Sequence, residues 1–122
     1  MVKKILVVDD EENIRKLIET RLKANQYNVI TASNGAEALE KAESEAPDLI
    51  LLDIMMPELD GLEVLRKLKS KFETSSIPVI MLTGKMDTGT ILSAQDLEAK
   101  DYIIKPFEPQ ELLNLIKKYI EF

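Results

Sequence analysis

Short apolar runs alternate along the chain with longer stretches in which apolar residues recur three or four positions apart. The run from Lys4 to Val8 is nearly continuous, which is typical of a strand buried on both faces of a parallel sheet. Strands are predicted at residues 4–8, 27–31, 48–52, 77–82 and 102–104.

The stretches between these runs predict amphipathic helices. Acidic residues at 10–12 suit a helix start, Asn34 and Gly35 open a second helix, and Pro47 ends it. A weaker helix is expected around residues 91–97, and the last helix covers 108–119. The apolar stripes of the first and third helices are Ile14, Leu17, Ile18 and Leu22, and Leu62, Leu65, Leu68 and Phe72.

Five strand–helix units of this length predict a three-layer α/β fold of the doubly wound (βα)5 type. Right-handed crossovers place helices on both faces of such a five-stranded parallel sheet. Five strands suit the flavodoxin-like strand order 2-1-3-4-5. Because the chain has 122 residues and no linker-like tract, residues 1–122 are expected to form one domain.

The composition of the chain excludes several classes of function. The net charge of −6, with no run of Lys or Arg longer than two, argues against nucleic acid binding by this domain. The absence of cysteine and histidine excludes disulfides, thiol nucleophiles, zinc chemistry and histidine-dependent triads. No apolar stretch reaches membrane-spanning length, so we expect no membrane contact and a cytoplasmic location.

Carboxylates stand after two of the predicted strands: Asp9 and Asp10 after the first, and Asp53 after the third. In this fold, ligands bind at the C-terminal strand ends where the winding reverses, which is between these two strands. Three converging carboxylates repel one another, and Mg²⁺ with its preference for oxygen ligands would relieve the repulsion. The alternative is a solvated helix start with an unrelated turn aspartate, which the matching position of Asp53 disfavours.

Thr83 closes the fourth predicted strand and Lys105 follows the fifth. Alone, each is commonly a turn or surface residue, but together they bring a hydroxyl and an ammonium to the same crevice. Phosphoryl transfer needs charge neutralisation and positioning more than covalent assistance. The pattern therefore predicts Asp53 as the nucleophile, with Mg²⁺, Lys105 and Thr83 each contacting one phosphoryl oxygen.

Five motifs surround these residues: Val7-Val8-Asp9-Asp10-Glu11, Leu52-Asp53-Ile54-Met55-Met56-Pro57, Asp60-Gly61, Leu82-Thr83 and Lys105-Pro106-Phe107. Together they closely resemble the receiver domain of bacterial response regulators, over essentially the whole chain. The resemblance implies that Asp53 is the phosphoacceptor and Lys105 the phosphate-binding lysine. It implies that Asp9, Asp10 and the backbone carbonyl of Met55 help hold Mg²⁺. It also implies a switch pair, Thr83 and Tyr102, and a cis peptide between Lys105 and Pro106.

The same resemblance implies two-component signal transduction. A sensor histidine kinase or phosphotransfer protein would supply the phosphoryl group. The surface formed by the fourth helix, fifth strand and last helix would then switch binding to a downstream protein effector or to an output domain that this chain lacks. The domain is expected to be a phosphoacceptor switch rather than a turnover enzyme, and a monomer or a weak dimer through that surface.

Three other functions fit the sequence less well. An aspartyl-phosphate phosphatase of the haloacid dehalogenase type would need two aspartates separated by one residue, and a cap domain, whereas Asp9 and Asp10 are adjacent. A flavin or nucleotide carrier would need a hydroxyl- or glycine-rich phosphate loop after the first strand. A degenerate receiver that only binds proteins would have lost one of the site residues, and none is lost.

Some positions depart from the usual receiver pattern. Gly84 replaces a common alanine, and residues 87–90, with Gly89, form helix poorly. Glu98 stands where glycine is typical, so a positive φ there would strain it by about 1 kcal/mol. These departures cluster on the expected output face. Met55 and Lys85 occupy positions that influence the lifetime of the phosphoryl group in similar proteins. The sequence does not indicate whether they lengthen or shorten that lifetime.

Overall fold

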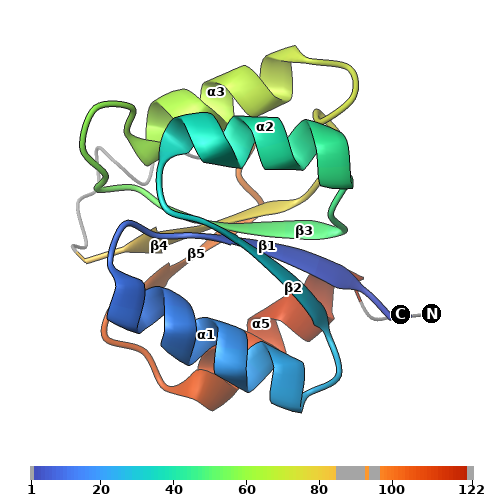
Figure 1. Ribbon diagram of the computed structural model, residues 1–122, viewed down its shortest axis with the longest axis vertical. Helices are drawn as coiled ribbons and strands as arrows, with labels where there is room; N and C mark the ends of the chain where they lie inside the picture. The colour runs from blue at the N-terminus through green and yellow to red at the C-terminus, as the bar shows by residue number, and fades with distance from the viewer. Residues whose placement is uncertain (1, 85–92, 94–96, 121–122) are drawn as a thin grey trace.

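A five-stranded parallel sheet lies at the centre of the computed structural model (Figure 1). The structure describes residues 2–84, 93 and 97–120. The strand order is β2-β1-β3-β4-β5, with every neighbouring pair parallel, which confirms the predicted topology. The strands are β1 (Lys4–Val8), β2 (Asn28–Ala32), β3 (Leu49–Asp53), β4 (Val79–Thr83) and β5 (Asp101–Ile104).

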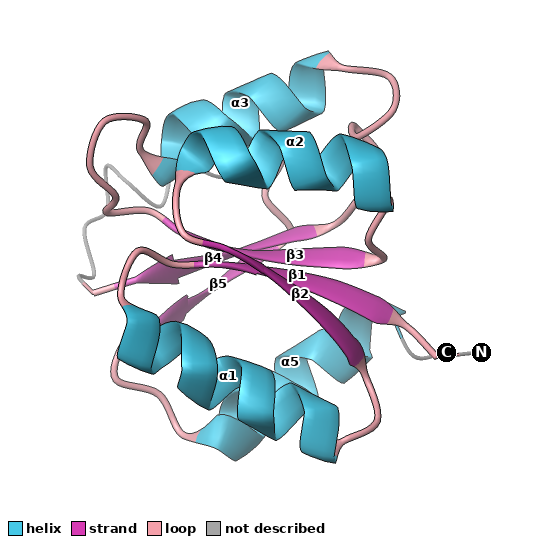
Figure 2. Cartoon of the chain, viewed as in Figure 1, coloured by secondary structure: helices cyan, strands magenta, loops and turns pink. Residues whose placement is uncertain are grey.

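Helices cover both faces of this sheet (Figure 2). On one face lie α1 (Glu12–Ala24) and α5 (Pro109–Ile120), and on the other lie α2 (Gly35–Glu45) and α3 (Gly61–Ser70). The helix expected around Ile91 and Ala94 falls outside the described residues. None of the helices described is long and apolar enough to cross a membrane.

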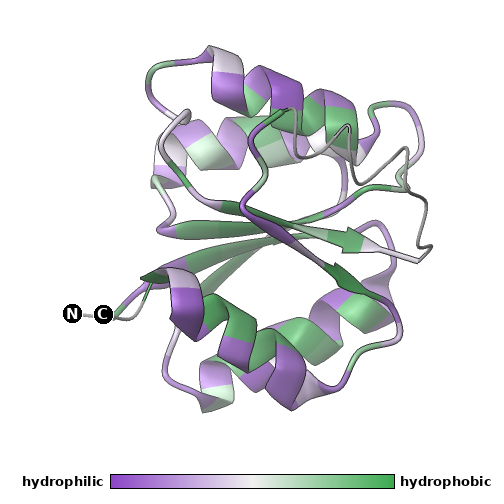
Figure 3. Ribbon diagram, turned by 180° about the vertical axis from the view of Figure 1, so that it is seen from behind, coloured by the Kyte–Doolittle hydropathy of each residue, from purple (hydrophilic) through white to green (hydrophobic). Residues whose placement is uncertain are grey.

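Two apolar clusters, one on each face of the sheet, form the core. Successive strand residues alternate between them: Leu6 and Val8 pack toward α2 and α3, while Ile5 and Val7 pack toward α1 and α5. The three strands β1, β3 and β4 are almost wholly buried, which explains their nearly unbroken apolar sequences. Each helix turns its apolar side toward the sheet and its polar side outward (Figure 3).

Several predicted strand boundaries are wrong by one or two residues. The second strand begins at Asn28 rather than Tyr27, because the Tyr27 amide donates to the Leu22 carbonyl at the end of α1 (3.1 Å). The fourth begins at Val79 rather than Ile77, since Pro78 has no amide to donate. The third and fourth strands also extend one residue further, so that Asp53 and Thr83 are the last residues of β3 and β4.

Two residues assigned to buried helix stripes are exposed. Leu17 on α1 is 51% exposed, and Phe72, expected on the third helix, is 92% exposed. The helix α3 ends at Ser70, and Lys71 is extended. The buried Thr74 hydroxyl donates to the Leu68 carbonyl (2.6 Å), which holds the chain in a turn where another helical turn was predicted.

Other local predictions are confirmed. The Asn34 side chain accepts from the Glu37 amide (2.8 Å) and caps α2. The helix ends at Glu45, followed by Ala46 in the left-handed conformation and then Pro47. Glu98 has a φ of 68°, the strained value anticipated for it. The peptide between Lys105 and Pro106 is cis.

Candidate phosphorylation and metal site

The C-terminal ends of four strands bring the predicted site residues to one edge of the sheet. Asp9 directly follows β1, Asp53 closes β3, Thr83 closes β4 and Lys105 directly follows β5. Neighbouring strands are in parallel register, with Asp53 opposite Leu82 and Thr83 opposite Ile104. The sequence assigned these side chains to the correct edge because the strands are parallel, and the strand order makes the ends of β1 and β3 neighbours.

The three carboxylates form a compact cluster. One oxygen from each of Asp9, Asp10 and Asp53 lies within 4.8 Å of the others. Asp9 is fully buried and Asp53 is 2% exposed, whereas Asp10 is exposed. The cluster thus has a buried floor and an open side toward solvent.

Both carboxylate oxygens of Asp9 accept hydrogen bonds. The Oδ1 atom accepts from the Glu11 amide (2.9 Å), and Oδ2 accepts from the Lys105 ammonium (2.8 Å). The backbone of Asp9 is held as well: its amide donates to the Ala32 carbonyl (3.2 Å), and its carbonyl accepts from the Arg15 guanidinium (2.8 Å). Both the side chain and the backbone of Asp9 are therefore held in place by hydrogen bonds.

Asp53 is held more loosely. Its Oδ1 atom lies 3.4 Å from the Lys105 ammonium and accepts from the Met55 amide at 3.3 Å. Burial, and then the negative charge of Asp9, raise the pKa of Asp53 to about 6, while Lys105 opposes the rise. A buried, electrostatically strained carboxylate beside a solvent-accessible opening is the arrangement expected of a functional acid rather than a structural one.

Lys105 is the cation of the cluster and contacts both buried carboxylates. Burial by itself would lower the pKa of Lys105, but its bonds to Asp9 and the charge of Asp53 outweigh burial and raise the pKa. Its side chain is 15% exposed. The Lys105 amide donates to the Thr83 carbonyl (2.7 Å), which ties the residue after β5 to the end of β4.

Gly61 fixes the backbone beneath the acceptor. A Cβ at this position would lie 2.2 Å from the Asp53 carbonyl oxygen and 2.7 Å from Ile54 Cα, so only glycine fits. The Gly61 amide donates to the Ile54 carbonyl (2.9 Å), and the Asp60 side chain caps α3 by accepting from the Glu63 amide (3.0 Å). The sequence marked Asp60-Gly61 as a motif but gave no reason for the glycine.

The remaining predicted residues lie around this cluster. Thr83 is 3% exposed, and Met55 is 67% exposed at the mouth of the site. Tyr102 on β5 is half-buried against the cluster that faces α2 and α3. Its amide donates to Asp101 Oδ1 (2.9 Å), and Asp101 Oδ2 accepts from the Tyr119 hydroxyl (2.7 Å), so α5 is linked to the start of β5.

Arg15 contacts the site, and the sequence patterns did not predict this. The sequence does hold one indication: acidic residues are favoured near the start of a helix, yet a cation follows the acidic residues here. Its bond to the Asp9 carbonyl makes it part of the supporting structure of the cluster.

The donor set fits a hard divalent cation. Each of the three residues offers carboxylate oxygens, and no softer ligand accompanies them in the cluster of described residues. Oxygen ligands with an open, hydrated side suit Mg²⁺, which keeps several of its waters in proteins. An acidic pocket of the kind that binds Mg²⁺ is therefore present.

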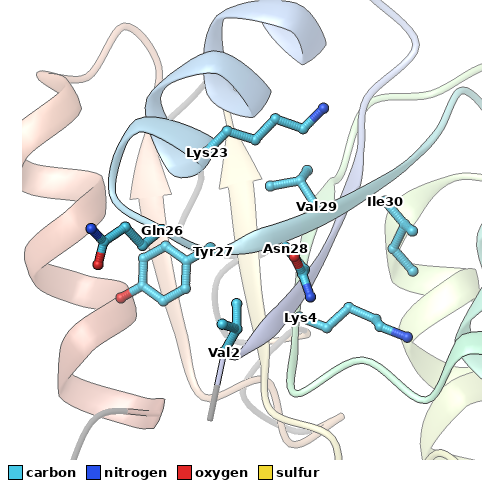
Figure 4. Close-up of a pocket in the computed structure, with 8 residues that line it drawn as sticks. All are labelled: Val2, Lys4, Lys23, Gln26, Tyr27, Asn28, Val29 and Ile30. Atoms are coloured by element: carbon cyan, nitrogen blue, oxygen red, sulfur yellow. The ribbon is translucent and has the colours of Figure 1, made fainter.

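A pocket elsewhere does not share this chemistry. It lies at the opposite end of the sheet, along the start of β2, and is lined in part by Lys4, Lys23, Tyr27 and Val29 (Figure 4). Its two lysines are paired with other residues: Lys4 with Glu45 (3.3 Å) and Lys23 with Glu19 (2.9 Å). It is a surface hollow of the edge strand and adds no group to the carboxylate cluster.

Comparisons with known proteins agree with the geometry. The family model of the response regulator receiver domain matches residues 5–117. The chain is 49% identical over 117 residues to the alkaline phosphatase synthesis transcriptional regulatory protein PhoP of Bacillus subtilis, covering 96% of this chain and 48% of that protein. It is 49% identical over 118 residues to the probable transcriptional regulator ycf27 of Cyanophora paradoxa, covering 97% and 48%. The chain thus spans about half the length of these relatives.

Solved structures give the same answer. The chemotaxis protein CheY4 of Vibrio cholerae superposes with a TM-score of 0.94 at 30% identity, covering 98% of this chain and 100% of that one. A CheY-like receiver domain protein from Methanospirillum hungatei superposes with a TM-score of 0.91 at 33% identity, covering 97% and 93%. With five parallel strands in the same order and the acidic cluster at the expected edge, this chain belongs to the response regulator receiver domain family of two-component signal transduction.

Proposed function

We propose that Asp53 accepts a phosphoryl group from a histidine kinase or phosphotransfer protein, assisted by Mg²⁺, Lys105 and Thr83. The observation that carries this proposal is the sharing of one partly buried ammonium: Lys105 lies 2.8 Å from Asp9 and 3.4 Å from Asp53. Asp9, Asp10, Asp53 and the backbone carbonyl of Met55 would hold the metal. Bound there, Mg²⁺ would neutralise charge on the cluster and on the phosphoryl oxygens.

The chemistry follows from which atoms are already engaged. Both described contacts of the Asp53 carboxylate fall on Oδ1, so Oδ2 is the oxygen we assign to attack phosphorus. The new O–P bond forms as the P–N bond to the donor histidine breaks. The imidazole leaves with the bonding electron pair and takes a proton from water. Lys105 would balance charge on the transferred group, and the Thr83 hydroxyl would donate a hydrogen bond to one of its oxygens.

An apolar groove beside the site is a suitable docking surface for the donor protein. It is lined by Ile14 and Leu17 of α1 and by Pro106 and Phe107, and Lys105 lies at its edge. The 51% exposure of Leu17, unusual for a large apolar side chain, is explained if a partner covers it. The donor would then sit over the residues that contact the acceptor.

The output would come from the surface formed by the fourth predicted helix, β5 and α5, of which the structure describes β5 and α5. Phosphorylation at Asp53 would draw in the Thr83 hydroxyl, and Tyr102 would turn inward into the space released. A second groove, between β5 and α5, includes Tyr102, Glu111 and Leu115 and would change shape with that movement. The two relatives described above are named as transcriptional regulators, so a DNA-binding output domain and a separate effector protein are both compatible partners.

Intact-mass spectrometry with a small phosphodonor tests the proposal. With Mg²⁺ and acetyl phosphate, we expect one hydroxylamine-labile phosphoryl adduct that is absent in Asp53→Asn and in EDTA. Rapid turnover of many phosphomonoesters would favour a phosphatase, and no adduct in any condition would favour a degenerate receiver. The single-domain boundary at 1–122, the cytoplasmic location and the monomer, or weak dimer through the surface of the fourth predicted helix, β5 and α5, stay predictions.

A further inference from the structure

Arg15 supports the carboxylate cluster through the backbone of Asp9. It lies one turn inside α1, and its guanidinium donates to the backbone carbonyl of Asp9 at 2.8 Å. Arg15 is half-buried while Asp9 is fully buried, so the bond spans from the helix surface into the floor of the site. The Asp9 carbonyl stands between the last residue of β1 and the start of α1, outside the sheet ladder.

This bond supplies a hydrogen-bond donor to the buried Asp9 carbonyl. A buried backbone carbonyl needs a hydrogen-bond donor, and leaving it without one costs about 1–3 kcal/mol. A cation close to a helix N-terminus is also disfavoured by the helix dipole. The position of Arg15 is therefore poorly explained by helix formation and well explained by the carbonyl that it reaches.

We infer that Arg15 is a positioning residue for Mg²⁺: it anchors the Asp9 backbone so that the Asp9 carboxylate keeps its place in the cluster. This inference rests on the proposed metal site. The Asp9 carboxylate is fixed at both oxygens by the Glu11 amide and Lys105, and Arg15 fixes the backbone from which that side chain projects. Groups that orient a metal ligand typically contribute 10- to 100-fold to metal affinity.

Simple electrostatics predicts the opposite result, which makes the inference testable. Removing a positive charge near three carboxylates leaves the cluster more negative, so it should bind Mg²⁺ more tightly if charge alone matters. Lys16 is a matched control: it is the next residue on α1, its side chain is 70% exposed, and it pairs with Glu12 at 3.1 Å. Its removal changes the net charge equally and leaves the Asp9 carbonyl untouched.

The experiment measures Mg²⁺ binding by calorimetry at pH 7.5 for the wild type, Arg15→Met, Arg15→Lys and Lys16→Met. We expect Arg15→Met to bind Mg²⁺ about 10-fold or more weakly. Lys16→Met should bind within about twofold of the wild type or slightly more tightly. Arg15→Lys, which keeps a donor on a shorter reach, should fall between. At saturating Mg²⁺, phosphorylation of Arg15→Met by acetyl phosphate should recover to near the wild-type rate, because Asp53 and Lys105 are unchanged.

Thermal unfolding in EDTA separates positioning from folding. A weaker affinity in Arg15→Met with the wild-type unfolding transition preserved supports the inference; if methionine prevents folding, Arg15→Gln takes its place. Affinity equal to that of Lys16→Met, or tighter than the wild type, overturns it, as does a loss of affinity that only accompanies loss of the fold. If the wild type itself binds no Mg²⁺, the proposed metal site fails together with this inference, whereas equal binding by all variants overturns the role of Arg15 alone.

Discussion

Replacing Asp53 with asparagine should stabilise the metal-free protein at neutral pH. The side chain is 2% exposed, and burial together with Asp9 raises its pKa from 3.8 to about 6. A carboxyl whose pKa is raised by folding holds its proton more tightly in the folded state. Folding is therefore opposed once the pH exceeds the pKa of the carboxyl in the unfolded chain, because folding must then either bind a proton or bury a charge. Asparagine has nearly the same shape and no charge, and it can still accept from the Met55 amide.

The pH window follows from the two pKa values. Below pH 3.8 the group is protonated in both states and contributes nothing to the free energy of unfolding. Between pH 3.8 and about 6 only the unfolded state is ionised, so stability falls as the pH rises. Above pH 6 the penalty is constant, at about 3 kcal/mol for this shift. At pH 4.5 the same relation gives about 1 kcal/mol.

Urea unfolding followed by far-ultraviolet circular dichroism in EDTA measures this difference. At pH 7.5 we expect the free energy of unfolding of Asp53→Asn to exceed that of the wild type by about 2–3 kcal/mol. The lower end of this range applies because water at the mouth of the site screens part of the charge. The gap should shrink to about 1 kcal/mol at pH 4.5. Saturating Mg²⁺ should narrow the gap at pH 7.5, because the ion stabilises the wild type more than the variant. The exposed Glu40 gives a control, and Glu40→Gln should change stability by less than about 0.5 kcal/mol at both pH values. A variant equal to or less stable than the wild type at pH 7.5 would refute the claim that the folded structure disfavours this charge.

Three further substitutions test other parts of the site. Lys105→Met should slow phosphorylation by acetyl phosphate on the order of 100-fold at saturating Mg²⁺, measured as adduct formation by mass spectrometry; a rate close to that of the wild type would deny the lysine its role. Gly61→Ala should cost about 3 kcal/mol in urea unfolding. Gly84→Ala should change stability by less than about 0.5 kcal/mol, because among the described residues, chain neighbours aside, no atom lies within 4 Å of the added Cβ. Thr83→Ala should still form the phosphoryl adduct but lose the change in amide hydrogen exchange that phosphorylation produces in β5 and α5; an unchanged exchange response would contradict the coupling through Thr83.

The sheet and the position of the site could be predicted because both depend on local patterns. Strands buried on both faces must be apolar at nearly every position, so β1, β3 and β4 are conspicuous in the sequence. Parallel strands joined by helices leave few possible orders, and any one of them places all C-terminal strand ends at the same edge. The aspartates that follow β1 and close β3 can therefore be placed in one crevice without knowing any distance.

The errors arise where a tertiary contact decides the local structure. Periodicity continued the third helix to Phe72, but the Thr74 hydroxyl takes the Leu68 carbonyl and turns the chain earlier. Gly61 is required by the close approach of the Asp53 carbonyl, and two residues eight positions apart give no pattern that reveals such an approach. The Arg15 bond likewise depends on how the loop after β1 folds back toward α1. These are contacts between elements, and spacing along one element does not predict them.

The proposal that Asp53 rather than Asp9 is the acceptor rests on how hydrogen-bond donors are distributed in the cluster. Both aspartates are buried and both contact Lys105, so burial and counter-charge alone do not distinguish them. Asp9 accepts at both oxygens, at 2.9 and 2.8 Å, and attack by either one would first break a short buried bond. The described contacts of Asp53 are longer, at 3.3 and 3.4 Å, and fall on a single oxygen. Burial and then the charge of Asp9 raise the pKa of Asp53, and the long contacts to Lys105 and the Met55 amide offset this only in part. We therefore expect Asp53, whose carboxylate has the longer contacts, to be the better nucleophile, with Asp9 held in a fixed position beside it.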